Sequence, residues 1–468
     1  MKTKSGPDKP GKKRPNWIDT VPPKVRECFI SAIKEHTAGR YDEAVALYSI
    51  ALNLMPDDPL LLTNLGVSLR ELGKFKASET CYRRAIAVKP ESPGTFSNLG
   101  NVLRRMGRLK EAVNCHRRAI ELDRKFIDAY YNLGLVLQDL GKLDEAVRLF
   151  NHCLKHNPDD SRVKWDKSLA LLAKGDFVTG FDLYENRWTR EELTSRHFRQ
   201  PVWDGSPLSG KTIFIYSEQG FGDTIHFCRY LPFVAEAGGK VVFECQPELV
   251  SLLKGMEGID DILSAGERLP DFDVQSPLLS LPRILKHDIK SIPRDCPYIK
   301  APAQAGFPVH IPEGTKFKIG IAWAGKPTHK NDHNRSVSIE NFFPFATIPG
   351  VSLYSLQKGP ETAQRDKFGI GLLVRDLGNG CSDFADTAKV MKQLDLIITV
   401  DTSVAHLAGA LNIPVWVAIP YNPDWRWMRK RKDSPWYPSM TLFRQKKAGE
   451  WESVFADMLK ELKHRLNC

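Results

Sequence analysis

The sequence lacks long apolar runs and closely spaced cysteines. No stretch of about 18 consecutive apolar residues occurs in the 468-residue chain, so no transmembrane helix is expected. The N-terminus is basic but contains no apolar segment of the kind that a secretory signal needs. The nine cysteines are scattered and include no Cys-x-x-Cys pair, so we expect reduced, buried thiols. These absences predict a cytoplasmic protein.

A concentrated basic face is also lacking, although the net charge is +11. Seven lysines and arginines and two aspartates fall in the first 25 residues, beside prolines and glycines, which predicts a disordered basic tail over residues 1–27. The remaining excess is spread over helices and over residues 426–432. No nucleic-acid-binding module is present, so no nucleic-acid partner is expected. A phosphorylated substrate, or a weak peripheral contact with an anionic membrane surface, explains the charge more simply.

The first third of the chain does contain a repeat of 34 residues. An Asn-Leu-Gly triplet, a small residue, a glycine and a proline recur at this interval. This combination is the tetratricopeptide pattern, in which helix pairs stack into a solenoid because no pair can bury its apolar face alone. The recurring positions are Asn64-Leu65-Gly66, Asn98-Leu99-Gly100 and Asn132-Leu133-Gly134; Ala44, Ser78, Ala112 and Ala146; Gly39, Gly73, Gly107, Gly141 and Gly175; and Pro56, Pro90 and Pro158.

We therefore predict an α-solenoid of tetratricopeptide repeats over residues 28–192. Three repeats fit well between residues 62 and 158, one before them is partial, and the unit Ser168–Trp188 is expected to be a cap. Two roles remain open for such an array. It is either a scaffold that binds a protein or peptide in its groove, or a device that delivers an acceptor to a catalytic part of the chain.

Beyond a linker over residues 196–210, the pattern changes to alternating strands and helices, which predicts a parallel sheet covered by helices. With a length that suits about three domains, the chain has room for such a region. The expected elements are a strand at Thr212–Tyr216, a polar turn at 217–224, a helix at Ile225–Ala237, a strand at Val241–Cys245 and a helix at Leu249–Gly255.

Asp223 stands out in the polar turn, at the start of the expected helix and directly after Gly220 and Gly222. It is either a helix-capping aspartate or a general base that faces a cleft, where the glycines let another molecule approach the backbone. Ile225 occupies the position where a dinucleotide fingerprint needs a third glycine, so a cofactor of that kind is not expected.

A second set of strands is expected from Lys316–Trp323 onward. The loop that follows, residues 324–336, is long, polar and basic, and its Lys326 and Arg335 are suited to phosphate oxygens. A solvated surface loop is the alternative. The next strand, Val351–Leu356, leads into Gln357 and Lys358, and helices are expected at 383–394 and 450–466.

The segment 394–416 is the strongest sign of a ligand site. Its apolar, β-branched run Leu396–Val400 predicts a strand buried on both faces. Asp401, Thr402 and Ser403 follow, then a short helix at Ala405–Leu411 and another strand. A polar turn at the carboxyl end of such a strand is where open α/β sheets bind ligands, and the helix start offers free N–H groups to a phosphate.

Three of these segments resemble glycosyltransferase family 9, whose best-known members are the ADP-heptose:lipopolysaccharide heptosyltransferases. They are Gly222-Asp223, the loop 323–336, and Val400–Leu411. The resemblance implies a two-lobed GT-B domain of twin Rossmann-like lobes, with an acceptor-side lobe over residues 193–312 and a nucleotide-sugar lobe over 313–468. The expected fold class is therefore α + α/β, a tetratricopeptide solenoid followed by a GT-B glycosyltransferase domain.

The resemblance also implies roles for individual residues. Asp223 matches the aspartate proposed to deprotonate the acceptor hydroxyl, and the implied reaction is an inverting sugar transfer from a nucleotide-diphosphate donor without a metal or cofactor. His406 has a second interpretation, a buried histidine bonded to a backbone carbonyl. The implied acceptor-side loop is Gln219, Gly220 and Gly222, and the implied donor-binding residues are Lys326, Arg335, Gln357, Lys358, Asp401, Thr402, Ser403 and His406.

Two other functions compete with this enzyme. One is a tetratricopeptide interaction scaffold whose glycosyltransferase-like domain does not catalyse a reaction. The other is a sensor that binds a nucleotide sugar in the same cleft without turnover. In the enzyme, the donor-diphosphate half of the site and Asp223 lie on different lobes and are expected to face each other.

Overall fold

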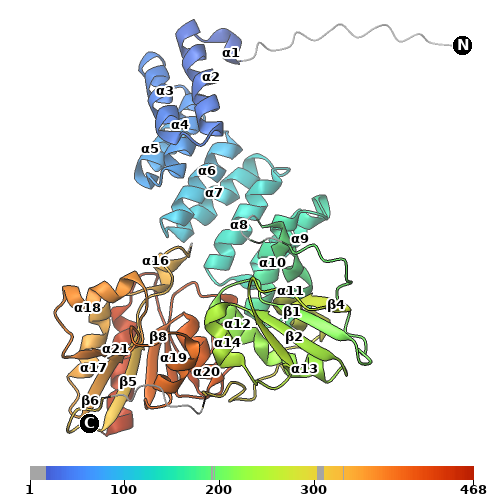
Figure 1. Cartoon of the computed structure of the whole chain (residues 1–468). Coiled ribbons are helices and arrows are strands. Elements are labelled where there is room, and N and C mark those ends of the chain that lie inside the picture. The colour runs from blue at the N-terminus through green and yellow to red at the C-terminus, as the bar shows by residue number, and fades with distance from the viewer. Residues whose placement is uncertain (1–16, 191–192, 194, 303–309, 330, 468) are drawn as a thin grey trace, which may run out of the picture. The chain divides into compact units, whose positions relative to one another are not determined.

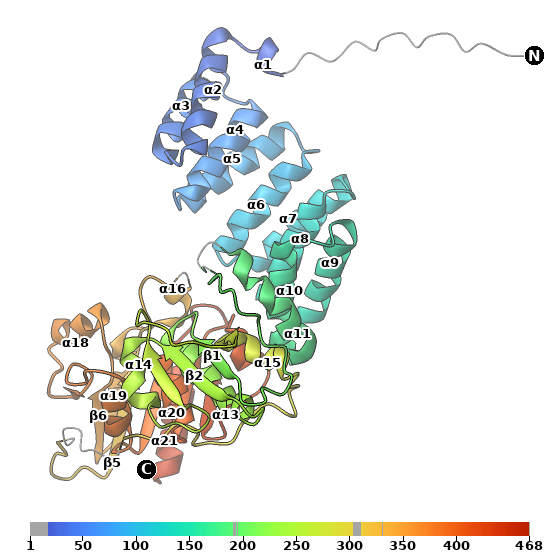
Figure 2. The ribbon, with the colours of Figure 1, turned by 45° about the vertical axis from the view of Figure 1, so that its right-hand side comes forward.

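The computed structural model describes residues 17–190, 193, 195–302, 310–329 and 331–467, and the chain divides into two compact units after Pro158. In the described ranges, the first unit is helical and the second contains two parallel sheets, as Figure 1 and Figure 2 show. No described helix is long and apolar enough to cross a membrane. The predicted order, a helical array followed by an α/β region, is confirmed.

In the first unit, helices pack as successive pairs: α2 with α3, α4 with α5, α6 with α7, and α8 with α9. A glycine with positive φ separates the helices of each pair, as the 34-residue register predicts. The helices are α1 (Trp17–Thr20), α2 (Pro23–Thr37), α3 (Tyr41–Leu54), α4 (Pro59–Glu71), α5 (Phe75–Val88), α6 (Pro93–Arg105), α7 (Leu109–Leu122), α8 (Ile127–Asp139) and α9 (Leu143–His156).

The glycine of each Asn-Leu-Gly triplet lies against a ring on the second helix of its pair. A Cβ atom at Gly66 would come within 2.7 Å of the Tyr82 ring, and one at Gly134 within 2.7 Å of the Phe150 ring. Only glycine permits this approach, which explains why the triplet recurs.

The prediction that residues 1–27 form a disordered tail is wrong for residues 17–27. Residues 17–27 form α1 and the first turn of α2, whereas residues 1–16 lie outside the described part of the chain. Residues 17–27 form helices because they carry an apolar face, which the many basic residues at this end of the chain concealed. Trp17 packs edge-on against Phe29 at 4.8 Å and donates a hydrogen bond from Nε1 to Asp58 at 2.8 Å, and Val25 is fully buried.

His116 occupies the ring position of the third pair, where the neighbouring pairs have Tyr82 and Phe150. It is fully buried on Gly100, and its Nδ1 lies 3.4 Å from Ser97 Oγ. Its Nε2 has no hydrogen-bond partner in the part of the chain that the structure describes. Burial lowers the pKa of His116 to about 4. The protonated form is therefore disfavoured in the fold, and stability is lost as pH falls from the unfolded-state pKa of about 6.5 toward 4.

Replacing His116 with phenylalanine is expected to remove this acid sensitivity. Between pH 7 and pH 5, the wild-type protein should lose about 2 kcal/mol more of unfolding free energy than the variant does. Urea unfolding of both proteins at the two pH values, followed by circular dichroism, measures the difference. Equal losses would show that His116 does not titrate as its burial requires.

The helices α10 (Ser161–Lys174) and α11 (Phe177–Tyr184) continue the repeat register but belong to the second unit. The rings of Phe177 and Phe181 lie 6.3 and 5.6 Å from that of Trp425, far along the chain. The predicted array of residues 28–192 thus divides at Pro158, and its expected cap is built into the sheet-containing unit.

Sheet A has the strand order β3-β2-β1-β4 and all its strands are parallel. Its first strand has the predicted bounds. The predicted helix 225–237 is broken into three segments, and Pro232, which has no N–H to donate, lies in the first turn of the last of them. The elements are β1 (Thr212–Tyr216), β2 (Lys240–Cys245), β3 (Asp261–Ser264), β4 (Val274–Pro277), η1 (Glu185–Thr189), α12 (Phe221–Phe227), η2 (Cys228–Tyr230), α13 (Leu231–Ala235), α14 (Pro247–Leu253), η3 (Leu278–Ser280) and α15 (Leu281–Ile284).

Sheet B has the order β10-β9-β8-β5-β6-β7, again all parallel, which is the doubly wound order of a Rossmann-like sheet. Its strands are β5 (Phe317–Ala322), β6 (Val351–Ser355), β7 (Val374–Asp376), β8 (Leu396–Val400), β9 (Val415–Ile419) and β10 (Met440–Arg444). Its helical segments are α16 (Asp332–Arg335), η4 (Ile339–Phe342), α17 (Phe343–Ala346), η5 (Pro360–Thr362), α18 (Ala363–Lys367), α19 (Phe384–Met391), α20 (Ser403–Ala410), η6 (Trp425–Trp427) and α21 (Glu452–Leu466).

The two sheets share one hydrophobic core. A continuous cluster of buried side chains runs from Ile213 and Phe243 of sheet A, through α12 and α20, to Ile397 and Val417 of sheet B. The other face of sheet B packs against α21 and η4. The two sheets are therefore in contact through this core.

Candidate functional site

Both sheets have a topological switch point, where the chain connections leave to opposite sides of neighbouring strands. In sheet A it lies between β1 and β4, and in sheet B between β5 and β8. The polar turn 217–224 follows β1, the loop 323–336 follows β5, and residues 401–403 follow β8. Ligands of open parallel sheets bind outside the carboxyl ends of the strands at such points, so the topology favours the segments that the sequence predicted.

Asp223 lies in the first turn of α12 and forms an ion pair with Arg426 of η6. Its Oδ1 accepts a hydrogen bond from Arg426 Nη2 at 2.6 Å, and its Oδ2 accepts one from the Gly220 N–H at 3.1 Å. Arg426 is 6% exposed, whereas the Asp223 side chain keeps 24% exposure and can be reached from outside. Burial raises the pKa of Asp223, although the Arg426 charge opposes this shift.

Arg426 is held on several sides. Its Nη1 donates to Asp424 Oδ1 at 2.9 Å, its guanidinium lies 4.4 Å from the centre of the Trp425 ring, and its carbonyl oxygen accepts from Trp436 Nε1 at 3.1 Å. Its Nε is buried and has no hydrogen-bond partner among the described residues. One N–H of this buried cation therefore remains unused beside the carboxylate of Asp223.

The start of α20 lies against the glycine that precedes Asp223. A Cβ at Gly222 would be 3.6 Å from the Ser403 Cα and 3.0 Å from His406 Cδ2. The predicted pairing of the β1 turn with the β8 turn is therefore present in the fold. Thr402, at the N-cap of α20, interacts through Oγ1 with Thr399 Oγ1 at 3.3 Å, and its side chain accepts no hydrogen bond from the N–H groups of this helix in the described structure. Helix starts of this kind attract anions.

His406 takes part in a contact between the two sheets. Its Nδ1 lies 2.8 Å from the hydroxyl of Tyr437, and the Nδ1 of His226 on α12 lies 2.9 Å from the same hydroxyl. Which group donates in each contact depends on the tautomer of the histidine, since a hydroxyl can both donate and accept. Burial lowers the pKa of both well below the ordinary value, so both are neutral. The Nδ1 of His406 is therefore occupied by Tyr437.

Asp401 lies close to several charged groups from sheet B. Its pKa is raised to about 6 by burial and by the carboxylate of Asp424, whereas Arg335 and Arg426 act in the opposite direction. The Arg335 side chain is 15% exposed and its Nε lies 3.4 Å from Asp332. Asp401, one of the predicted donor-binding residues, is thus near enough to interact electrostatically with Arg335, another of them, and with Arg426.

Two other predicted donor residues support the backbone. The amide of Gln357 accepts from the N–H groups of Trp323 and Ala324, both at 3.0 Å, and donates to the Ala324 carbonyl at 3.1 Å. Lys358 donates to the carbonyl oxygen of Cys381 at 2.6 Å. Gln357 therefore fixes the start of the loop that carries Lys326, which is exposed.

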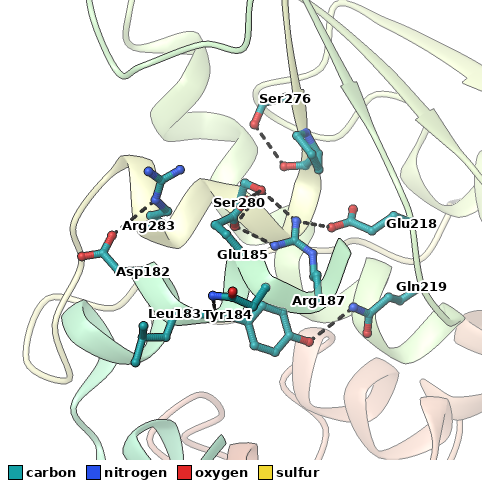
Figure 3. A network of polar contacts seen from close by, with 12 residues as sticks. Asp182, Leu183, Tyr184, Glu185, Arg187, Glu218, Gln219, Ser276, Ser280 and Arg283 are labelled. Atoms are coloured by element: carbon teal, nitrogen blue, oxygen red, sulfur yellow. Dashed lines mark hydrogen bonds and ion pairs between the residues drawn. The ribbon is translucent and has the colours of Figure 1, made fainter. Parts of the chain in front are cut away.

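The β1 turn is anchored to the last repeat helices by a buried network around Arg187 (Figure 3). Arg187 is fully buried and donates to Glu185 at 2.6 Å, to Glu218 at 2.8 Å and to Ser280 Oγ at 2.8 Å. Gln219, predicted in the acceptor-side loop, donates from Nε2 to the Tyr184 hydroxyl at 3.3 Å, as Figure 3 also shows. The turn that positions Asp223 thus rests on α11 and η1.

Sequence reasoning missed Arg426, Asp424, Tyr437 and Arg187. Arg426 was counted only as part of a basic stretch. A signal did exist, since Asp424-Trp425-Arg426-Trp427 places an arginine between two tryptophans shortly after a buried strand, a setting typical of a buried cation. Nothing in the sequence indicated that its partner would be Asp223, 203 residues away.

Chemically, the arrangement places a reachable carboxylate, a buried cation beside it and the start of α20, which the Thr402 side chain does not cap, close together. A proton acceptor and a site for an anionic group are therefore adjacent. Among the described residues, no group of three or more His, Cys, Asp or Glu side chains is arranged to hold a metal ion.

Known structures resemble the helical part of the chain. The crystal structure of MamA is 24% identical, with 34% of this chain and 94% of MamA covered and a TM-score of 0.31. A thermophilic TPR protein of Thermus thermophilus is 20% identical, with 36% and 91% covered and a TM-score of 0.32. The first TPR of Spaghetti, bound to an HSP90 peptide, is 26% identical, with 25% and 93% covered and a TM-score of 0.25.

Among curated proteins, Protein FlbA of Caulobacter vibrioides is 24% identical over 327 residues, which cover 63% of this chain and 54% of FlbA. The match spans about half of that relative's length. Tetratricopeptide repeat family models match residues 36–94 and 127–160, and a TPR repeat model matches residues 100–141. The N-terminal region therefore contains tetratricopeptide repeats, as the 34-residue period predicts.

Proposed function

We propose that the second unit is a metal-independent inverting glycosyltransferase of GT-B type, which transfers a sugar from a nucleotide-diphosphate donor to an acceptor hydroxyl. The observation that carries the proposal is the junction of the two switch points, where Asp223 and Gly222 of sheet A lie against Arg426 and the start of α20 of sheet B. The wide separation of these segments in the sequence makes their meeting informative.

In the proposed reaction, Asp223 takes the proton of the acceptor hydroxyl as its oxygen attacks the anomeric carbon. The bond between that carbon and the donor diphosphate breaks, and the nucleoside diphosphate leaves with the electron pair. The negative charge that develops on it is stabilised by the start of α20 and by Arg426 and Arg335, with Lys326 at the rim. No metal or cofactor enters this scheme.

The tetratricopeptide repeats support a protein or peptide partner, because stacked helix pairs form an extended surface suited to binding one. We propose that the array recruits the acceptor or a partner that carries it. A cytoplasmic location and a peripheral contact with an anionic membrane surface remain expectations from composition and charge.

A binding module without turnover is the second candidate. The observation that favours it is that Gln357 and His406, both predicted to contact the donor, use the Gln357 amide and the His406 Nδ1 for contacts within the fold. In that case, the unit is a nucleotide-sugar sensor or a non-catalytic part of an interaction scaffold.

A panel of nucleotides tests both proposals for the cleft. We expect one of UDP, ADP, GDP or their sugars to raise the melting temperature, because a ligand at 100 times its Kd stabilises the folded state by about 2.7 kcal/mol. If none of them shifts the transition, neither the enzyme nor the sensor is supported and the scaffold is favoured.

A further inference from the structure

Met428, the residue after η6, has a backbone conformation that is essentially restricted to glycine. Its φ is 51° and its ψ is −164°. A side chain in this region of φ and ψ strains the backbone, and such a residue persists only where its surroundings fix the conformation. The strain occurs two residues after Arg426, the partner of Asp223.

Arg444, the last residue of β10, provides the surroundings that fix this turn. Its guanidinium donates to the carbonyl oxygens of Trp427, of Met428 at 3.0 Å and of Arg431 at 2.8 Å. All three of these acceptors are backbone oxygens, so the planar guanidinium sets the direction of the chain on both sides of the strained residue.

Arg444 makes these contacts at an electrostatic cost. Burial, together with the positive charges of Arg429 and Arg431, lowers the pKa of Arg444 to about 10. Because the neighbouring arginines repel this partly buried cation, its position is better explained by its hydrogen bonds to carbonyl oxygens than by a long-range electrostatic attraction.

The turn held in this way carries groups that meet the other sheet. Arg426 reaches Asp223, and the Trp427 ring stacks on His406 with 5.1 Å between ring centres. Without the strained conformation of Met428, the chain would continue in another direction after Trp427. The side chains of Arg426 and Trp427 would then move.

We propose that Arg444 is a positioning residue, which holds Met428 in its strained conformation and thereby places the Arg426 guanidinium on Asp223. Any effect on sugar transfer rests on the proposed function, whereas the placement of Arg426 does not. This separation allows the inference to be tested without a substrate.

The test uses the full-length protein and three variants, Arg444→Gln, Met428→Gly and the double variant. Arginine labelling with phenylglyoxal, mapped by mass spectrometry, reports how well Arg426 is protected. Its side chain is 7% exposed in the fold, whereas that of Arg83 is 51% exposed and provides an internal reference. The melting temperature is measured in parallel.

We expect Arg444→Gln to raise the labelling of Arg426 several-fold, to leave that of Arg83 unchanged and to lower the melting temperature. The double variant should regain wild-type protection, because glycine adopts the turn without strain and no longer needs the clamp. Rescue of this kind would not follow from a general loss of packing.

Unchanged Arg426 labelling in Arg444→Gln, or additive losses in the double variant, would overturn the proposal. If Arg444→Gln does not fold, Arg444→Lys replaces it, since lysine keeps the charge but not the planar fork, and intermediate labelling is expected. Wild-type protection in Arg444→Lys would also contradict the proposal. None of these outcomes depends on whether a nucleotide sugar binds.

Discussion

Replacing Asp223 with asparagine is expected to slow sugar transfer by at least about 100-fold, because a general base typically contributes 10²- to 10⁴-fold to a rate. Nucleotide binding should persist, since asparagine has the same shape and can still accept from the Gly220 N–H, while Arg426 keeps Asp424 as a partner. The rate of nucleoside diphosphate release and the melting-temperature shift with nucleotide measure the two effects separately.

Asp424→Asn is the matched control for this variant. Asp424 also pairs with Arg426 but lies at the N-cap of η6 rather than in the turn after β1, so a smaller loss of rate is expected. Because protonated Asp223 cannot accept a proton, the wild-type rate should also fall as the medium is acidified through the raised pKa of Asp223. Wild-type turnover in Asp223→Asn would exclude the base role.

Replacing Arg187 with methionine is expected to lower the free energy of unfolding by about 3–5 kcal/mol, the largest effect on stability predicted for this protein. Arg187 is fully buried, and its removal leaves Glu218, whose side chain is 5% exposed, without its positive partner. Burial raises the pKa of Glu218 to about 7 even with Arg187 present, so the charged form of this carboxyl is disfavoured at this position. Denaturant unfolding of the full-length protein measures the loss.

The double variant Arg187→Met with Glu218→Gln provides the control, because it removes both charges. Its stability should lie between that of the single variant and the wild-type protein, since a buried charge without a partner costs more than an absent pair. An Arg187→Met protein as stable as the wild type would mean that this network does not anchor the β1 turn.

The parts of the fold that the sequence predicted well depend on local or periodic patterns. The 34-residue period identified the helix pairs, because each repeat meets the same packing problem. The bounds of β1 and β8 agree with the mainly apolar, β-branched and aromatic runs Thr212–Tyr216 and Leu396–Val400, since a strand buried on both faces is apolar at most positions.

The parts that it missed depend on contacts between distant residues. Arg426 meets Asp223 across 203 residues, and the amide of Gln357 is used by backbone groups 33 and 34 residues away. Neither contact produces a periodic pattern in the amino-acid sequence. The apolar face of residues 17–25 was hidden for a different reason, since the basic charge of the preceding residues dominated the composition of that end.

The central claim is that the junction of Asp223 with Arg426 and the start of α20 is the two-part site of a glycosyltransferase. The most direct measurement is the release of nucleoside diphosphate when the purified full-length protein is incubated with a panel of nucleotide-sugar donors and candidate acceptors. The account predicts catalytic release from one donor, lost in Asp223→Asn. Release from no donor, with binding retained, would contradict the enzyme and leave the nucleotide-sugar sensor.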